Sequence, residues 1–247
     1  MLSKVAAYYW EGPPMSWLRQ QSIASFRHLN PDWEVRGLVR PQALDGEDTM
    51  RARAIRSDLA RYRWLAEDGG LYFDTDIIWR RPIPEAWRDS DVLIPMRAEG
   101  IVHSIAVLGG TPGRFWKHVA DVAGMTAEGT EPLAYQSLGV KLLNGVIGYS
   151  APVPSVVGML GERFLSYPHH QILPVSWAYA ERLWSAKKLL FDDDVVGVHW
   201  YGGDPLSIDM EPRMRGTSDD PSCVIRDLIS EVFPSGEPAA VRASLGL

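Results

Sequence analysis

Apolar residues near the N-terminus recur with the spacings of alternating strands and helices. An apolar run at Val5–Trp10 ends at Gly12-Pro13-Pro14, which predicts a buried strand followed by a loop. Apolar residues at helical spacing predict a helix over Met15–Leu29, and a second strand is predicted over Trp33–Val39. The chain is therefore expected to begin with a strand, a helix and a strand.

The strongest helical signal lies over Met50–Glu67. The residues that define its buried face recur every three or four positions: Ile55, Leu59, Tyr62 and Ala66. Gly69-Gly70 follow directly, and glycine readily adopts the left-handed conformation that ends many helices. We expect the helix to end there in a tight turn.

Acidic and basic side chains accompany this helix and the strand after it. Asp58 and Arg61 are three positions apart, so they share a stripe at the edge of the buried face. A buried strand is predicted over Leu71–Phe73, and Asp74 and Asp76 follow its end. Such strand ends open into the crevice where α/β sheets bind ligands. Two carboxylates there can hold Mg²⁺ or Mn²⁺, which neutralises a departing diphosphate.

The rest of the chain continues the alternation. Further strands are predicted over residues 91–96, 101–108 and 195–198, and helices over 112–122, 132–143 and 223–233. Residues 209–222 are polar and predict a mobile loop. This pattern predicts an α/β fold with helices flanking a central sheet. We expect one domain over 1–208, with 209–247 forming a C-terminal loop and helix packed on it or extending from it.

Composition narrows the classes of partner and compartment. A net charge of −6 provides no basic field, so stable nucleic-acid binding is not expected. The single cysteine, Cys223, cannot form an internal disulfide, which fits a reducing compartment and predicts a cytoplasmic protein. No run approaches the roughly 20 apolar residues of a transmembrane helix, so any membrane association is expected to be peripheral.

The segment from Ser57 to Asp76 resembles the DxD glycosyltransferase family 32, including the catalytic domain of the clostridial glucosylating toxins. The shared features are an S-D-x-x-R stretch, a Gly-Gly turn and a Y-x-D-x-D strand end. Weaker resemblances are Tyr9-Trp10-Glu11-Gly12 and the His-aromatic-Gly segment at Val198–Gly203, which continues with Asp204-Pro205 where the family usually has Ser-Trp. The resemblance implies a GT-A type, Rossmann-like nucleotide-sugar-binding fold with a mixed sheet.

The same resemblance implies roles for individual residues. Asp76 would ligate the metal directly, while Asp74 would bind the ribose or reach the metal through water. Asp58 and Arg61 would hold sugar hydroxyls, and Trp10 would stack on the base. The full expected set is catalytic Asp58, Arg61, Asp74, Asp76 and His199; donor-binding Trp10, Tyr72, Asp74, Trp200 and Gly202; and metal-binding Asp74, Asp76 and His199, with Asp204 as the alternative to His199.

The expected activity is metal-dependent, retaining transfer of a hexose from a nucleotide diphosphate sugar, with a UDP-sugar as first choice and Mn²⁺ or Mg²⁺ as cofactor. The acceptor could be a glycan, a lipid-linked saccharide, a protein or a modified nucleobase. Two other readings remain. A phosphatase of the haloacid dehalogenase type uses a similar aspartate pair, although Ile78 and the late position of the motif argue against it. A non-catalytic nucleotide-sugar-binding protein is the third.

Overall fold

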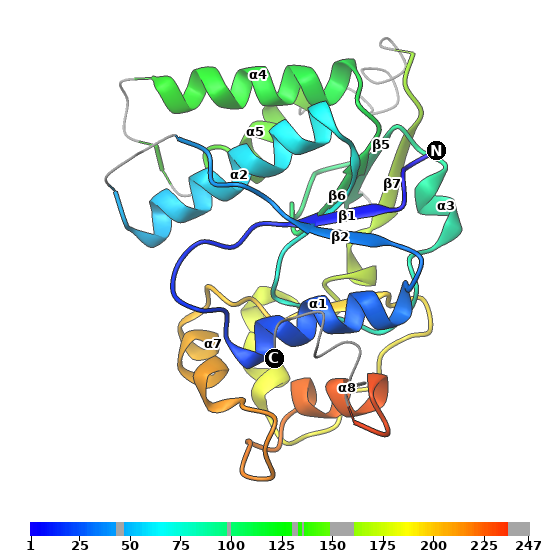
Figure 1. Ribbon diagram of the computed structural model, residues 1–247, viewed down its shortest axis with the longest axis vertical. Coiled ribbons are helices and arrows are strands. Elements are labelled where there is room, and N and C mark those ends of the chain that lie inside the picture. Colours follow the sequence, from blue (N-terminus) through cyan, green and yellow to red (C-terminus); the bar gives the residue numbers. More distant parts are fainter. Residues whose placement is uncertain (43–46, 98–99, 130–132, 135, 149–160, 237–247) are drawn as a thin grey trace. The chain divides into compact units, whose positions relative to one another are not determined.

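The computed structural model describes residues 1–42, 47–97, 100–129, 133–134, 136–148 and 161–236 (Figure 1). The chain divides into two compact units that alternate along the sequence. The first unit comprises residues 1–11, 34–74 and 85–169, and the second comprises residues 12–33, 75–84 and 170–247. The boundary therefore separates Asp74 from Thr75, within the D-x-D sequence.

The first unit contains a six-stranded sheet in the order β2-β1-β3-β6-β5-β7. Its strands are β1 (Val5–Tyr8), β2 (Glu34–Gly37), β3 (Gly70–Phe73), β5 (Val92–Met96), β6 (Val107–Gly110) and β7 (Phe164–Pro168). Strands β2, β1 and β3 are parallel, whereas β6 runs antiparallel to β3 and β5. β7 is parallel to β5. The predicted mixed central sheet is thus confirmed, and β1 and β3 end at the same sheet edge.

Helices of the first unit cover one face of this sheet (Figure 1). They are α2 (Met50–Glu67), α4 (Arg114–Glu128) and α5 (Val140–Ile147), and a short α3 spans Glu85–Arg88. One core joins them to the sheet and includes Leu59, Leu65, Tyr72, Ile94, Leu108, Trp116, Val119 and Leu143. Successive side chains alternate between the faces of a strand, so Tyr72 of β3 points toward the helices.

The turn from α2 to β3 depends on two glycines. The amides of Asp68 and Gly69 both donate to the Trp64 carbonyl, at 2.9 and 3.0 Å. Gly69 and Gly70 have φ values of +70° and +113°, so the predicted left-handed turn is confirmed. A Cβ on Gly70 would also lie 2.3 Å from the Val5 carbonyl oxygen. Glycine therefore permits β3 to begin directly beside β1.

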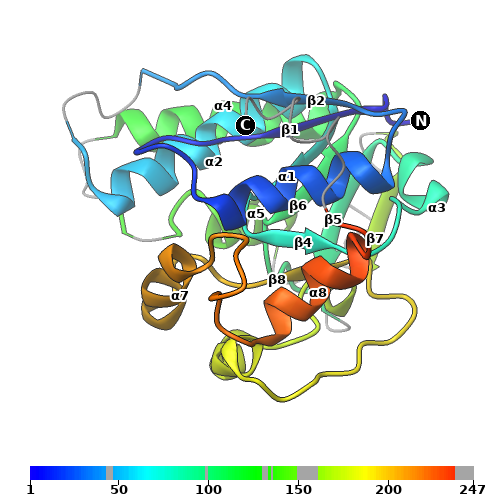
Figure 2. The same cartoon turned by 60° about the horizontal axis from the view of Figure 1, so that its bottom comes forward.

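The second unit is built around the antiparallel pair β4 (Ile77–Trp79) and β8 (Gly197–His199). Helices α1 (Trp17–Leu29) and α8 (Val224–Val232) both pack on β4 (Figure 2). The shared core includes Leu18, Ile78, Val198, Trp200, Ile225 and Leu228. The remaining helices are α7 (Pro205–Met210) and the 3-10 segments η1 (His169–Gln171, whose first residue lies in the first unit), η2 (Trp177–Trp184) and η3 (Glu211–Arg213).

Two of the predicted elements are placed wrongly by the sequence patterns. The strand expected over 101–108 is observed as β6, Val107–Gly110, and Val102 forms only an isolated antiparallel bridge with Met96. The N–H and C=O of Val102 also bond the Asn144 side chain, at 2.9 and 3.0 Å. The loop expected over 209–222 is helical as far as Arg213. The Asp204 carboxylate accepts the Leu206 N–H and caps this helical stretch.

Other boundaries shift by a few residues. The helix expected over 112–122 continues to Glu128, and that expected over 132–143 is observed as Val140–Ile147, with residues 132 and 135 outside the described part. Strands β4 and β7 were not predicted. None of the helices in the described part combines the length and hydrophobicity that a membrane crossing requires.

The glycine turn provides a direct test of the fold. We expect Gly70→Ala to lower the free energy of unfolding by about 2–5 kcal/mol, since the side chain adds backbone strain and a clash with Val5. Gly124→Ala, in α4 with no atom within 4 Å of the new Cβ, should instead raise it by about 0.5–1 kcal/mol. Urea unfolding of both variants provides the measurement. Equal effects would contradict this explanation of the turn.

Candidate active site

The carboxyl ends of β1 and β3 supply the first part of the site. Asp74 follows Phe73 directly, and its N–H donates to the Ala106 carbonyl at 2.7 Å. Tyr72, the last inward-facing residue of β3, donates its hydroxyl to Asp74 Oδ1 at 2.9 Å. Burial raises the pKa of Tyr72 well above its usual value, so the hydroxyl keeps its proton. Asp74 is thereby fixed at the end of the strand.

Arg61 connects α2 to the same strand end. Its Nη2 lies 3.3 Å from Asp58 Oδ1 and 3.2 Å from Asp74 Oδ1. Nη1 donates to the Ile105 carbonyl at 2.6 Å, and the guanidinium lies 4.4 Å from the centre of the Tyr72 ring. The side chain is only 5% exposed, so both aspartates compensate a buried cation. The predicted proximity of Asp58 and Arg61 is confirmed and extends to Asp74.

Asp58 occupies an unusual environment for an acid. Burial raises its pKa to about 7, although Arg61 opposes the shift, and the negative charge of Asp74 adds to it. Near pH 7 the carboxyl therefore exchanges between its charged and neutral forms. It can accept a hydrogen bond from a hydroxyl in one form and donate to a hydroxyl in the other.

The segment after β1 is held by a second buried arginine. Glu11 accepts the Arg56 Nε–H at 2.7 Å and the Tyr9 hydroxyl at 2.6 Å, and the Arg56 side chain is fully buried. These contacts fix the backbone on either side of Trp10, which is half-buried. The structure thus places Trp10 on an ordered segment at the carboxyl end of β1.

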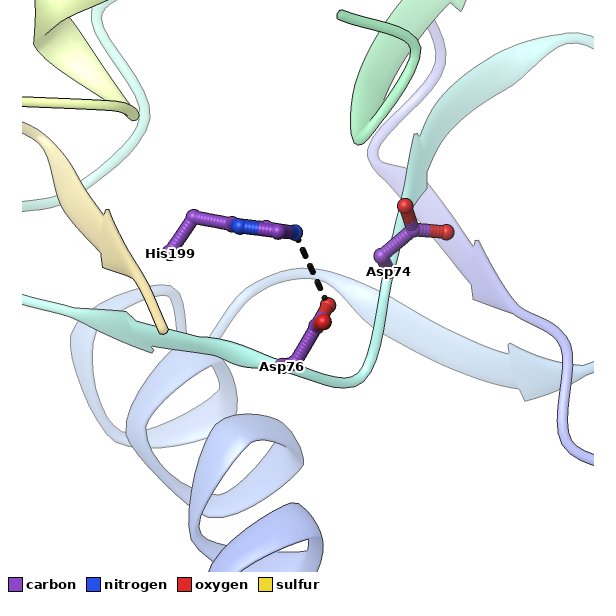
Figure 3. A group of neighbouring side chains, drawn as sticks. All are labelled: Asp74, Asp76 and His199. Atoms are coloured by element: carbon purple, nitrogen blue, oxygen red, sulfur yellow. Dashed lines mark ion pairs between the residues drawn. The ribbon is translucent and has the colours of Figure 1, made fainter. Parts of the chain in front are cut away.

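Asp76 and His199 come together within the second unit. Figure 3 shows the Asp76 carboxylate and the His199 imidazole pointing toward one another, with Oδ1 3.1 Å from Nε2. The Gly202 N–H donates to Asp76 Oδ2 at 2.8 Å, and the Trp200 N–H donates to the Asp76 carbonyl at 3.0 Å. Burial alone would raise the pKa of Asp76, but His199, Arg19 and the Gly202 N–H hold it well below its usual range. Asp76 is therefore an anion held in a defined orientation.

The residues after β8 orient His199 and Asp76 through their backbone. The Tyr201 N–H donates to His199 Nδ1 at 3.2 Å, which directs Nε2 toward Asp76. The Trp200 side chain is fully buried in the core of the second unit, so its indole is a packing group there, and its backbone N–H donates to the Asp76 carbonyl. Asp204, the alternative metal ligand, caps α7 through Oδ1.

Sequence patterns missed two charged residues beside this pair. Arg19, in α1, donates through Nη1 to the Thr75 hydroxyl at 3.1 Å and through Nε to Glu211 Oε1 at 2.8 Å. Glu211 also accepts the Ser16 hydroxyl at 2.6 Å. Arg19 and Glu211 are 192 positions apart, and neither belongs to a motif, so no local signal marked them.

Residues 18–94 match the family model described as the glycosyltransferase sugar-binding region containing the DXD motif. The chain carries a glycosyltransferase region. The prediction of a DxD glycosyltransferase, and hence of an enzyme, is confirmed. Its assignment to family 32 and its similarity to the toxins stay predictions. A sequence comparison with curated proteins gave no match.

One solved structure supports the fold of this chain. The galactosyltransferase LgtC, in complex with donor and acceptor sugar analogues, is 13% identical, with a TM-score of 0.50 over 97% of this chain and 99% of that one. An active-site variant of LgtC is 14% identical, covering 96% and 99% at a TM-score of 0.49. A glycosyltransferase involved in glycosylation of the major capsid of PBCV-1 is 12% identical, covering 80% and 93% at 0.43. The predicted GT-A type fold is confirmed.

The buried carboxyl of Asp58 predicts a characteristic dependence of stability on pH. Its pKa of about 7 in the folded state exceeds the ordinary value of 3.8, so the folded protein binds the proton more tightly than the unfolded chain does. The contribution of Asp58 to stability is therefore lost as pH rises from about 4 to 7. Asp58→Asn removes this titration, and its stability relative to wild type should rise by on the order of 1–3 kcal/mol over that range.

Urea unfolding at several pH values measures this difference. Asp121→Asn, which alters an exposed carboxylate paired with Lys117, is the matched control and should change stability by less than about 0.5 kcal/mol throughout. A difference between Asp58→Asn and wild type that stays constant with pH would show that Asp58 is charged throughout in the folded protein.

Proposed function

We propose that the protein is a metal-dependent glycosyltransferase that transfers a hexose from a nucleotide diphosphate sugar, with UDP-sugars as the first candidates. The observation that carries the proposal is that each carboxylate of the D-x-D sequence has its own buried support. Arg61 and Tyr72 hold Asp74, while His199 faces Asp76. Ordinary solvated acids need no such support, whereas a site that receives a cation and a diphosphate requires oriented, charged carboxylates.

We propose that Asp76 and His199 hold Mn²⁺ or Mg²⁺, together with Asp74, two positions earlier in the chain. The residue types fit, because carboxylate oxygens and an imidazole nitrogen suit Mn²⁺, and Asp76 stays ionised. A bound metal would neutralise the charge that develops on the departing diphosphate. The Tyr201 N–H directs the His199 ring, and the Gly202 N–H orients the Asp76 carboxylate before any ligand arrives.

The proposed roles in the first unit concern the donor. Arg61 and Asp58 hold hydroxyls of the transferred sugar. Because Asp58 exchanges between charged and neutral forms near pH 7, it could accept a hydrogen bond from a sugar hydroxyl or donate one to it. Tyr72 holds Asp74 in place through Oδ1, and this carboxylate would bind the ribose or, through water, the metal. Trp10, on its ordered segment, stacks on the base. Gly202 contributes backbone contacts to the donor. Trp200 also does so through its backbone, because its indole is buried in the core.

The proposed transfer retains the configuration at the anomeric carbon, as the family resemblance implies, and needs no covalent carboxylate nucleophile. The departing diphosphate would assist the acceptor on the same face of the sugar. The proposed acceptor classes are a glycan, a lipid-linked saccharide, a protein or a modified nucleobase. The one cysteine, Cys223, which is buried, supports a cytoplasmic location.

Incubation of the purified protein with a panel of nucleotide sugars and Mn²⁺ tests the activity. We expect release of nucleoside diphosphate from at least one donor, and its loss on metal chelation. Asp76→Asn should lower kcat/KM at least roughly 100-fold, since even residues behind the ligands of a metal cost 10–100-fold. Asp193→Asn, at an exposed aspartate paired with Arg81, is the control and should retain activity. Chelator-resistant turnover, or full activity of Asp76→Asn, would contradict the proposal.

The stereochemical outcome is tested separately. An NMR time course of donor hydrolysis should show the anomer of the donor as the first sugar product, because retention is expected. If the first detectable sugar has the inverted configuration, the retaining mechanism is wrong, while the proposed donor and metal sites would be unaffected.

A further inference from the structure

Arg19 lies beside the D-x-D sequence in the second unit. Its backbone N–H donates to the N-cap residue Ser16 of α1 at 3.2 Å, so the side chain leaves from the first turn of that helix. The side chain is 14% exposed and contacts two elements: Nε donates to Glu211 of η3, and Nη1 donates to Thr75, between the two aspartates. The guanidinium therefore bridges η3 and the centre of the D-x-D sequence.

Gly202 shows how tightly this guanidinium is placed. A Cβ at position 202 would lie 2.2 Å from Arg19 Nη2 and 3.1 Å from Asp76 Oδ2. Any larger residue there would displace the arginine, the carboxylate or both. The Gly202 N–H meanwhile donates to Asp76 Oδ2, the oxygen on the side away from the contact of Oδ1 with His199. Arg19 Nη2 and Asp76 Oδ2 thus both lie close to the Gly202 backbone.

Glu211 fixes the position of the Arg19 side chain and partly neutralises its positive charge. Its carboxylate is 11% exposed and accepts from both Arg19 and Ser16, so it is ordered by two donors. A buried carboxylate without such partners would be strongly destabilising. Because one guanidinium is shared by Glu211 and the D-x-D segment, the positive field acting on Asp76 depends on Glu211.

We propose that Arg19 is a positioning residue, held by Glu211 against Thr75 and Gly202, which orients Asp76 toward His199 while Glu211 offsets the arginine's repulsion of a cation. The inference rests on the proposed function, because it assumes that Asp76 and His199 bind a divalent metal. η3 thereby has a role in the site, although the sequence pattern over this stretch predicts a polar loop.

Binding of Mn²⁺ alone to the full-length protein, followed by electron paramagnetic resonance, tests the proposal independently of turnover. Glu211→Gln keeps the shape but removes the charge, and it should weaken Mn²⁺ binding about tenfold. The double variant Arg19→Gln with Glu211→Gln should recover the wild-type affinity to within about threefold, since it restores the net charge. Asp209→Asn, an exposed acid paired with Arg213, is the matched charge control and should leave binding unchanged.

Turnover separates positioning from a general loss of structure. Arg19→Gln should bind Mn²⁺ at least as well as wild type, yet its kcat should fall about tenfold, because Thr75 and Asp76 lose their fixed geometry. If Glu211→Gln does not fold, the kcat of Arg19→Lys tests the proposal instead. It should fall, since an ammonium group cannot bridge Glu211 and Thr75 in the way a guanidinium does. An unchanged kcat in Arg19→Lys would overturn the proposal.

Two results would overturn the proposal while leaving the proposed function standing. One is normal Mn²⁺ binding by Glu211→Gln when Asp76→Asn binds weakly. The other is that the double variant binds Mn²⁺ as weakly as Glu211→Gln does, because the effect of Glu211 would then be structural and independent of the charge of Arg19. Equal Mn²⁺ binding by wild type and Asp76→Asn would instead show that the metal site itself is wrong, and both proposals would fall together.

Discussion

The buried guanidinium of Arg61 is the constraint on which the part of the site in the first unit depends. A cation with 5% of its side chain exposed requires nearby anions, and Asp58 and Asp74 supply them from α2 and the end of β3. The same group contacts the Ile105 carbonyl and the Tyr72 ring. One charged group therefore links helix, strand and loop, and the burial that makes it costly also raises the pKa of Asp58.

The two aspartates of the D-x-D sequence belong to different units and are held by different groups. Asp74 belongs to the first unit and is held by a guanidinium and a phenol, whereas Asp76 belongs to the second and is held by an imidazole and a backbone amide. The pKa of Asp76 is held well below its usual range, so Asp76 remains an anion, whereas burial raises the pKa of Asp58, which contacts the same guanidinium as Asp74, to about 7. Such separation suits a site in which one carboxylate binds a cation and another exchanges hydrogen bonds with hydroxyls.

Local patterns predicted the parts of the site that are close in sequence. Helical periodicity and the Gly69-Gly70 turn suffice to bring Asp58 and Arg61 to the strand end. Contacts between distant segments left no such pattern, and the Arg19 pair with Glu211 and the Asn144 contacts with Val102 were missed for this reason. The resemblance pointed to His199, whose Nε2 lies 3.1 Å from Asp76 Oδ1. It also suggested donor contact by Trp200, whose side chain packs in the core.

We propose above all that the carboxylate and imidazole groups around Asp76 form a metal site for a nucleotide diphosphate. Anomalous diffraction at the manganese edge, from crystals soaked with Mn²⁺ and UDP, tests it most directly. We expect one strong peak in contact with Asp76 and His199 and with the diphosphate oxygens. A peak at other residues, or a diphosphate bound away from Asp76, would contradict it.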